Sequence, residues 1–103
     1  MSVKSQLNSS RDFILTGMRA AARVQTQNPG ATKILRGCLD LIETLERQPA
    51  ENLTITDIET TLNVLHQSMT EIDDETPQST AFVQSIKNAA GRLMDLRREL
   101  ATK

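Results

Sequence analysis

The apolar residues in the second half of the chain recur at intervals of three and four, which is the spacing of one face of an α-helix. The first of these stripes consists of Ile55, Ile58, Leu62, Leu65, Met69 and Ile72. A second stripe consists of Phe82, Ile86, Ala89, Leu93, Leu96 and Leu100, and it is widened by Val83, Ala90 and Met94. No segment alternates polar and apolar residues as a half-buried strand would. The sequence therefore predicts helices over residues 56–74 and 77–101 and no sheet.

Both predicted helices begin with residues typical of a helix N-terminus. Thr56 is followed three residues later by Glu59, which is a capping-box pattern. Thr76 is a favoured N-cap residue, and Pro77 after it suits the first helical position, where its missing N–H has no partner to lose. We therefore expect Thr56 and Thr76 to mark the two helix starts.

A third helix is predicted over residues 29–48, between Pro29 and Pro49. At 100° per residue its apolar side chains cover an arc of roughly 160°. These side chains are Ile34, Leu35, Cys38, Leu39, Leu41, Ile42 and Leu45. The connection that follows, about residues 49–55, is the longest in the chain.

The first predicted helix ends near residue 27, but two starts are compatible with its sequence. Its apolar face consists of Phe13, Ile14, Gly17, Met18, Ala21 and Val24. Ser9 with Asp12 could cap a start near residue 10. Val3 and Leu7 continue the same face upstream, which would place the start near residue 2. The small residues in its middle, Gly17 and 20–22, would let another helix pack closely.

These elements predict an all-α fold in a single helical domain over residues 1–103, with helices at about 2/10–27, 29–48, 56–74 and 77–101. The short connections favour hairpin-like reversals. We expect an antiparallel four-helix bundle, or two helical hairpins that complete a bundle by dimerisation.

Composition limits the core and the location. The chain has no Trp or Tyr and two Phe residues, so the core must be built from aliphatic side chains. Cys38 is the single cysteine and lies on an apolar face, so we expect a buried thiol in a reducing compartment. No stretch approaches the roughly 20 apolar residues of a membrane span. We therefore expect a cytoplasmic protein with no membrane contact.

No catalytic or cofactor motif is present. His66 is the one histidine and has no second ligand at metal-binding spacing, so we expect it to be half-exposed. The four glycines stand alone rather than in a phosphate-binding loop. Residues 73–75 are three acids, but they lack the alternating oxygen ligands of a calcium loop. We therefore expect a non-enzymatic protein with no cofactor, metal or small-molecule substrate.

The charges fall into three blocks. Residues 1–47 carry seven bases and four acids, residues 48–81 carry seven acids and no base, and residues 82–103 carry five bases and two acids. The net charges are therefore +3, −7 and +3. This layout suggests complementarity within the fold or between subunits, although solvated helix faces would look the same.

Six arginines are the candidate partner-binding residues: Arg11, Arg19, Arg23, Arg92, Arg97 and Arg98. Arg97 falls inside the apolar arc of its helix, so either its side chain reaches out to solvent or it meets an acid. Leu15 and Val64 lie off the apolar stripes of their helices, and Gly37 and Gly91 lie on polar faces.

We expect these features to serve a protein–protein interaction module: an adaptor, small chaperone, inhibitor, regulator or assembly component that recognises a protein partner, itself as a homodimer, or both. The alternative is a nucleic-acid-associated regulator that uses the arginine faces of the first and last helices. The isoelectric point of about 5.8 and the lack of aromatic residues for base stacking argue against that alternative.

Overall fold

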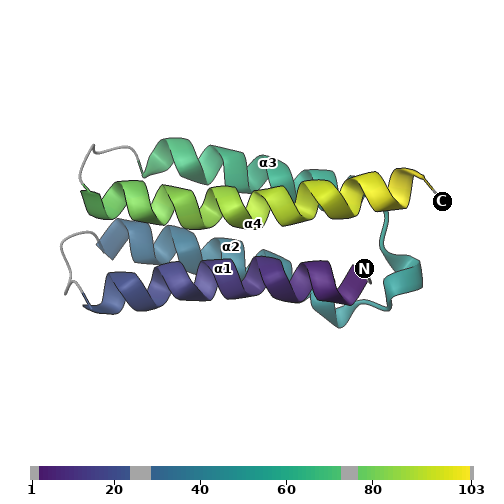
Figure 1. Cartoon of the computed structure of the whole chain (residues 1–103), viewed down its shortest axis with the longest axis horizontal. Coiled ribbons are helices and arrows are strands. Elements are labelled where there is room, and N and C mark those ends of the chain that lie inside the picture. Colours follow the sequence, from purple (N-terminus) through teal and green to yellow (C-terminus); the bar gives the residue numbers. More distant parts are fainter. Residues whose placement is uncertain (1–2, 24–28, 73–76, 103) are drawn as a thin grey trace.

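A computed structural model describes residues 3–23, 29–72 and 77–102, with the side chains of 20–31 and 77–79 left aside. Four helices and one short 3-10 turn follow in order: α1 (Val3–Arg23), α2 (Pro29–Arg47), η1 (Ala50–Asn52), α3 (Ile55–Glu71) and α4 (Pro77–Ala101). Successive helices run in opposite directions (Figure 1). The described residues contain no strand.

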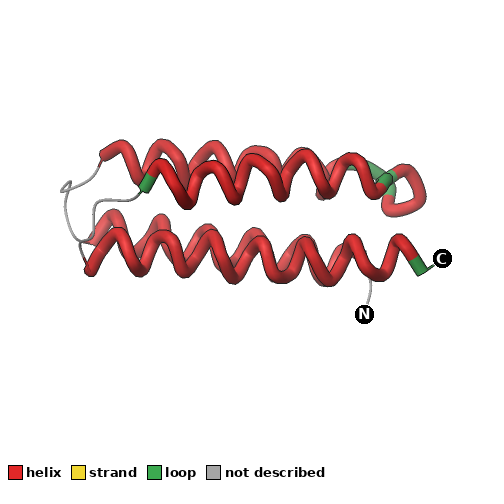
Figure 2. The backbone as a smooth tube through the Cα atoms, turned by 90° about the horizontal axis from the view of Figure 1, so that it is seen from above, coloured by secondary structure: helices red, strands yellow, loops and turns green. Residues whose placement is uncertain are grey.

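The helices form an antiparallel four-helix bundle with principal extents of 43 × 20 × 18 Å. α1 packs against α2 and α4, and α3 packs against the same two helices (Figures 1 and 2). The first and last helices are thus neighbours. The chain forms a bundle on its own and needs no second copy to complete it.

The core is aliphatic, as the composition predicts. Burying one such side chain contributes about 1.5–3 kcal/mol. The fully buried large side chains come from all four helices and include Leu7, Ile14, Leu35, Ile42, Ile58, Leu65, Ile86, Leu93 and Leu96. Leu15, which lies off the predicted stripe, is half-buried against this core.

α1 begins at Val3, so the longer of the two predicted forms is the one observed. The alternative start near residue 10 is wrong because Val3 and Leu7 are buried in the core, which holds the extra turns in place. Ser10, next to the expected cap, lies inside the helix and is fully buried. Its hydroxyl donates to the Ala89 carbonyl of α4 at 3.1 Å.

Gly17 lies where α1 and α4 approach each other closely. A Cβ at this position would lie 2.8 Å from Ser85 Oγ and 2.9 Å from Ser85 Cβ. The expected close packing around the small residues of α1 is confirmed at this glycine. Residues 20–22, the rest of that small-residue cluster, lie outside the described side chains.

The N-cap residue of α3 is not the one that the sequence predicted. Thr54, not Thr56, is the N-cap residue: its Oγ1 accepts from the Asp57 N–H at 3.2 Å. The Asp57 carboxylate in turn accepts from the Thr54 N–H at 3.1 Å. Thr56 fails as the cap because it already lies inside the helix. α3 also ends earlier than predicted, at Glu71; Thr76 and 73–75 lie outside the described residues.

The C-terminus of α2 is held by a side chain from the start of α1. Lys4 Nζ donates to the carbonyl oxygens of Glu46 and Gln48, the latter at 2.8 Å. The last carbonyls of a helix lack partners within it, and a cation there also meets the negative end of the helix dipole. This contact ties the two ends together across the hairpin.

Cys38 is a free, buried thiol, as expected. Its S–H donates to Ser68 Oγ at 3.5 Å, which joins α2 to α3. Burial raises the pKa of the thiol, and the hydrogen bond with Ser68 only partly offsets that effect.

Candidate partner-binding surface

Two of the six candidate arginines are engaged by neighbouring helices. Arg11 of α1 forms an ion pair with Glu46 of α2, with 3.5 Å between Nη1 and Oε2. The guanidinium of Arg92 in α4 lies 6.0 Å from the centroid of the Phe13 ring in α1, which is cation–π distance. These two side chains bridge elements of the bundle, so a partner would have to compete for them.

The other candidates divide by position. Arg19 is exposed on α1 and forms no ion pair with a described residue, and Arg97 and Arg98 are exposed near the end of α4. The side chain of Arg23 lies outside the described residues. The structure thus brings Arg97 and Arg98 together but separates them from Arg19, which lies towards the opposite end of the bundle.

Arg97 reaches solvent rather than an acid. Within the described part of the chain it forms no ion pair. The outward-reaching option of the sequence prediction is therefore the observed one. Arg98 pairs with Asp95 at 3.6 Å, but both side chains are open to water, at 75% and 42% exposed. Such a surface pair contributes little and leaves the guanidinium free to exchange partners.

Met94 corrects the sequence prediction. It was expected to widen the buried stripe of α4, but its side chain is 48% exposed, and it is the one exposed large hydrophobic residue among those described. Its position lies at the rim of the apolar arc, where the other helices no longer cover α4. Ala90 and Val83, predicted beside it, are buried and half-buried.

Met94, Arg97, Arg98 and Ala101 line a shallow hollow of about 220 Å³. We refer to these four residues as the Met94 patch. Their spacing of i, i+3, i+4 and i+7 places them along one side of the last turns of α4. The patch therefore joins an exposed apolar side chain to two exposed guanidinium groups.

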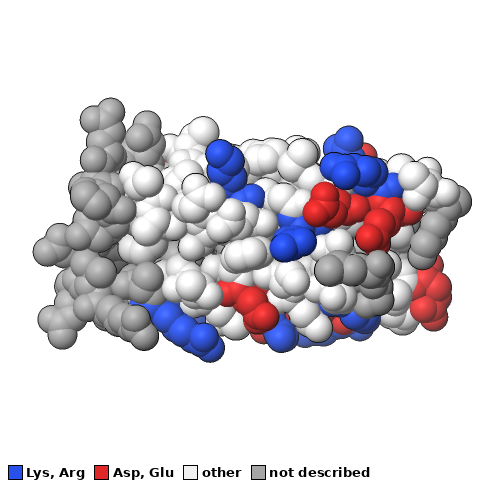
Figure 3. Space-filling model, viewed as in Figure 1, with Lys and Arg blue, Asp and Glu red and all other residues white. Residues whose placement is uncertain are grey.

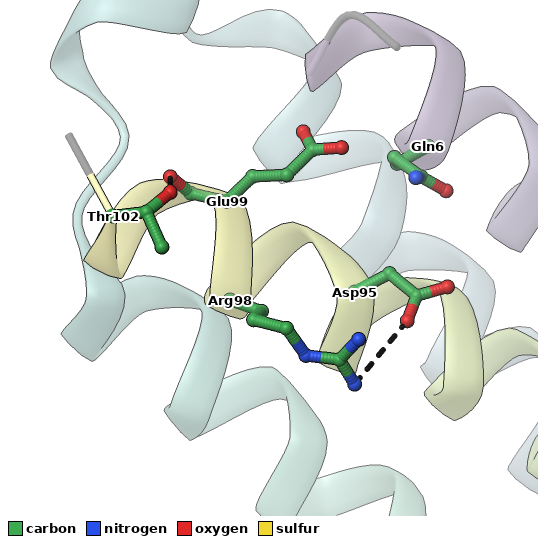
Figure 4. A pocket seen from close by; sticks show the side chains of 5 residues that line it. All are labelled: Gln6, Asp95, Arg98, Glu99 and Thr102. Carbon is green, nitrogen blue, oxygen red and sulfur yellow. Dashed lines mark hydrogen bonds and ion pairs between the residues drawn. The ribbon is translucent and has the colours of Figure 1, made fainter.

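A second hollow lies on the neighbouring side of Arg98, between α4 and the start of α1. It is lined by Gln6, Asp95, Arg98, Glu99 and Thr102 (Figure 4). Figure 4 shows Glu99 extending towards Gln6, while Asp95 holds Arg98. Gln6 is buried, and its Oε1 has no hydrogen-bond partner among the described residues. Two acids and one base give the lining of this hollow a net charge of −1, and Asp95 is already paired with Arg98.

Acidic and basic side chains lie next to one another over the last turns of α4 (Figure 3). The middle of the same face is mostly uncharged. A continuous basic strip along α1 and α4, which the nucleic-acid alternative needs, is not present among the described residues on this face. Asp95 and Glu99 interrupt it on α4.

Other kinds of site were sought in the described part of the chain. No group of three or more histidine, cysteine or acidic side chains is placed to hold a metal ion. His66 is exposed rather than half-exposed. None of the helices combines the length and apolar character required to cross a membrane.

Comparisons of the chain with protein-family models, with curated proteins and with solved structures give no match.

Sequence reasoning named Arg97 and Arg98 but missed Met94 as part of the same surface. The sequence feature that could have indicated Met94 is the position of Arg97 inside the apolar arc of α4. A charged residue inside the apolar arc indicates that this edge of the arc is open to water, although Leu93 and Leu96 on the centre of the arc are fully buried. Applied to Met94, three residues earlier, the same reasoning would have identified the patch.

Proposed function

We propose that this chain is a non-enzymatic protein-interaction module that binds a protein partner through the Met94 patch. The observation that carries the proposal is the exposed Met94 beside Arg97 and Arg98. Methionine and arginine are both enriched at protein interfaces. A flexible thioether adapts to irregular apolar surfaces, and guanidinium groups pair with carboxylates in two-point geometry.

The alternative, a nucleic-acid-associated regulator, has less support. Two of its required arginines, Arg11 and Arg92, are engaged by side chains of neighbouring helices. Arg98 has an acid beside it, and the exposed Arg19 lies towards the opposite end of the bundle. Phosphate binding gains from several bases acting on one strand, and these residues do not provide such a surface.

The proposed setting is the cytoplasm. A lone cysteine that is buried and unpaired is the usual state of this residue in a reducing compartment, which supports that location.

Site-specific photo-crosslinking in the native cells tests the proposed function. A photoreactive amino acid replaces Arg98 in one variant and Arg36, an exposed base of α2, in a control variant. We expect position 98 to give a discrete protein adduct that position 36 does not give. Adding Met94→Asp to the position-98 variant should reduce this adduct strongly. Identical adducts from both positions, or none from position 98, would contradict the proposal.

A salt titration tests the alternative. Binding of the purified chain to mixed-sequence DNA and RNA is measured from ~50 mM salt upwards, because phosphate contacts are strongest at low salt. We expect no binding at the lowest salt concentration. Tight binding that weakens steeply with salt would favour the nucleic-acid function instead.

A further inference from the structure

We infer that the partner of the Met94 patch is a second copy of this chain, whose own acidic residues Glu51 and Glu59 receive Arg97 and Arg98. This inference rests on the proposed function, because it names the occupant of the same patch. It assigns the complementary surface to η1 and the start of α3.

The chain has acidic surface residues that could receive the two arginines. Residues 48–81 contain seven acids and no base. Glu51 in η1 and Glu59 in α3 are both exposed, and neither forms an ion pair with a described base. Among the described residues, the chain thus has these two unpaired surface carboxylates, the unpaired guanidinium of Arg97, and that of Arg98, which is held only by a solvent-exposed pair with Asp95.

The topology of the bundle brings the acidic and the basic residues to the same end of the molecule. α3 begins at the end of the bundle where α4 finishes, so the two charge groups lie at one end of the same molecule (Figure 1). Among the described residues, the two groups are not paired with each other. We infer a twofold axis at this end that sets the bases of each copy against the acids of the other. The contact would then form twice, with the same residues on both sides.

Met94 and Ala101 add apolar area to this contact. The area is small, and the charged groups around it are partly screened by salt. We therefore expect a weak, reversible dimer with a dissociation constant in the micromolar range or above, and a dissociation constant that rises with ionic strength. Charge pairing mainly fixes which surfaces meet.

Sedimentation velocity on the purified chain, over a concentration series at ~50 mM and ~500 mM salt, measures the dimer directly. Two charge-reversal variants extend the test: Arg97→Glu with Arg98→Glu, and Glu51→Lys with Glu59→Lys. Each should raise the dissociation constant ~10-fold or more, because like charges then face each other. An equimolar mixture of the two variants should associate again, since both contacts of the mixed dimer are then complementary.

The matched control is Lys33→Glu with Arg36→Glu on α2. It reverses two exposed bases and gives the same net charge as the Arg97/Arg98 variant. This control should dimerise like the wild type, and circular dichroism confirms that each variant is folded.

Three results would overturn the inference: a wild-type chain that stays monomeric at all concentrations in low salt, a variant mixture that does not associate, or a control that dissociates as much as the patch variant. The result also separates the two proposals. A monomeric chain whose position 98 crosslinks to a different protein would refute self-association and leave the interaction function standing. A lack of any adduct at position 98 would refute the interaction function itself.

Discussion

Three glycines of the described chain lie in helix interiors with different surroundings. Gly17 faces Ser85 across the α1–α4 contact, whereas a Cβ at Gly37 or Gly91 would meet no other described atom within 4 Å beyond its own stretch of helix. Close packing therefore explains the glycine at position 17, whereas the described surroundings do not explain the glycines at positions 37 and 91. Substitution by alanine separates these cases, because alanine adds one methyl group and is the better helix former.

Gly17→Ala should destabilise the protein by about 1–3 kcal/mol, because the new methyl group overpacks a contact with little room to relax. Ser85 cannot avoid the clash by rotating, since its Cβ as well as its Oγ lies too close. Urea unfolding measures the change in free energy. Ser85→Gly in the Gly17→Ala background should recover much of the loss, and additive effects of the two substitutions would show that the contact is not the cause.

Gly37→Ala and Gly91→Ala serve as the contrasting pair. Each should stabilise the protein by about 0.5–1 kcal/mol through helix propensity and a less flexible unfolded chain. The measurement is the same urea titration. A loss of stability in either variant would mean that these positions are more crowded than their surroundings indicate.

Cys38 gives the folded state a pH dependence. Burial raises the pKa of the thiol, so the unfolded chain loses this proton first as the pH rises. The resulting stability is complete below the ordinary thiol pKa of about 8.5 and is lost as the pH rises through the folded value. The unfolding free energy of the wild type should therefore fall more than that of Cys38→Ala between about pH 7 and pH 9.5. Parallel pH profiles in reducing buffer would contradict this explanation.

At the scale of the element, helix starts depend on single side-chain contacts. The capping box of α3 pairs Thr54 with Asp57 in both directions. Thr54→Ala should lower the unfolding free energy by about 1 kcal/mol, because the Asp57 N–H loses its acceptor. Thr56→Ala is the matched control and should not destabilise the protein, since Thr56 is an exposed residue within the helix and alanine is the better helix former. Equal losses in the two variants, measured by urea unfolding, would refute the assigned cap.

The existence of each helix could be predicted from the sequence because apolar periodicity and proline position report the average burial of many residues. Pro29 and Pro77 stand at the observed starts of α2 and α4. The cap of α3 could not be chosen in the same way. Thr54 with Asp57 and Thr56 with Glu59 are similar patterns; the burial of Leu53 and Ile58, which flank the first of them, is consistent with a start at Thr54.

The patch was partly predictable for a related reason. Periodicity assigns a face to every turn of a helix, but it does not tell where the neighbouring helices stop covering that face. Met94 has a suitable angular position for a rim contact and remains exposed, whereas Ala90, one turn earlier, is covered. The charged Arg97 indicates in the sequence that this side of α4 is no longer covered. The exact place where the cover ends depends on the positions of the neighbouring helices.

At the scale of the whole molecule, the two terminal helices are held together by dissimilar contacts along their length. Ser10 bonds to Ala89, Gly17 packs on Ser85, and Phe13 lies under Arg92. These contacts join residues more than 65 positions apart, so the α1–α4 contact requires both ends of the chain. Such long-range contacts slow folding, because a large loop must close before they can form.

A circular permutant tests this account of the fold. The chain ends lie at the same end of the bundle, where Gln6 and Thr102 line one hollow (Figure 1). A flexible linker joins residue 103 to residue 1, and new ends open between Pro49 and Ala50, after the Gln48 carbonyl that Lys4 binds. The permutant should keep the helical circular dichroism spectrum of the wild type and fold faster, because α4 and α1 become sequence neighbours.

Stopped-flow refolding measures this rate, and the matched comparison is Gly17→Ala placed in both chains. If α1–α4 pairing forms in the folding transition state of the permutant, this substitution should slow its folding more than it slows the wild type. A permutant that folds at the wild-type rate would show that loop closure between the terminal helices does not limit folding. Folding would then be limited by a step that the two chains share, such as the packing of α3 against α4.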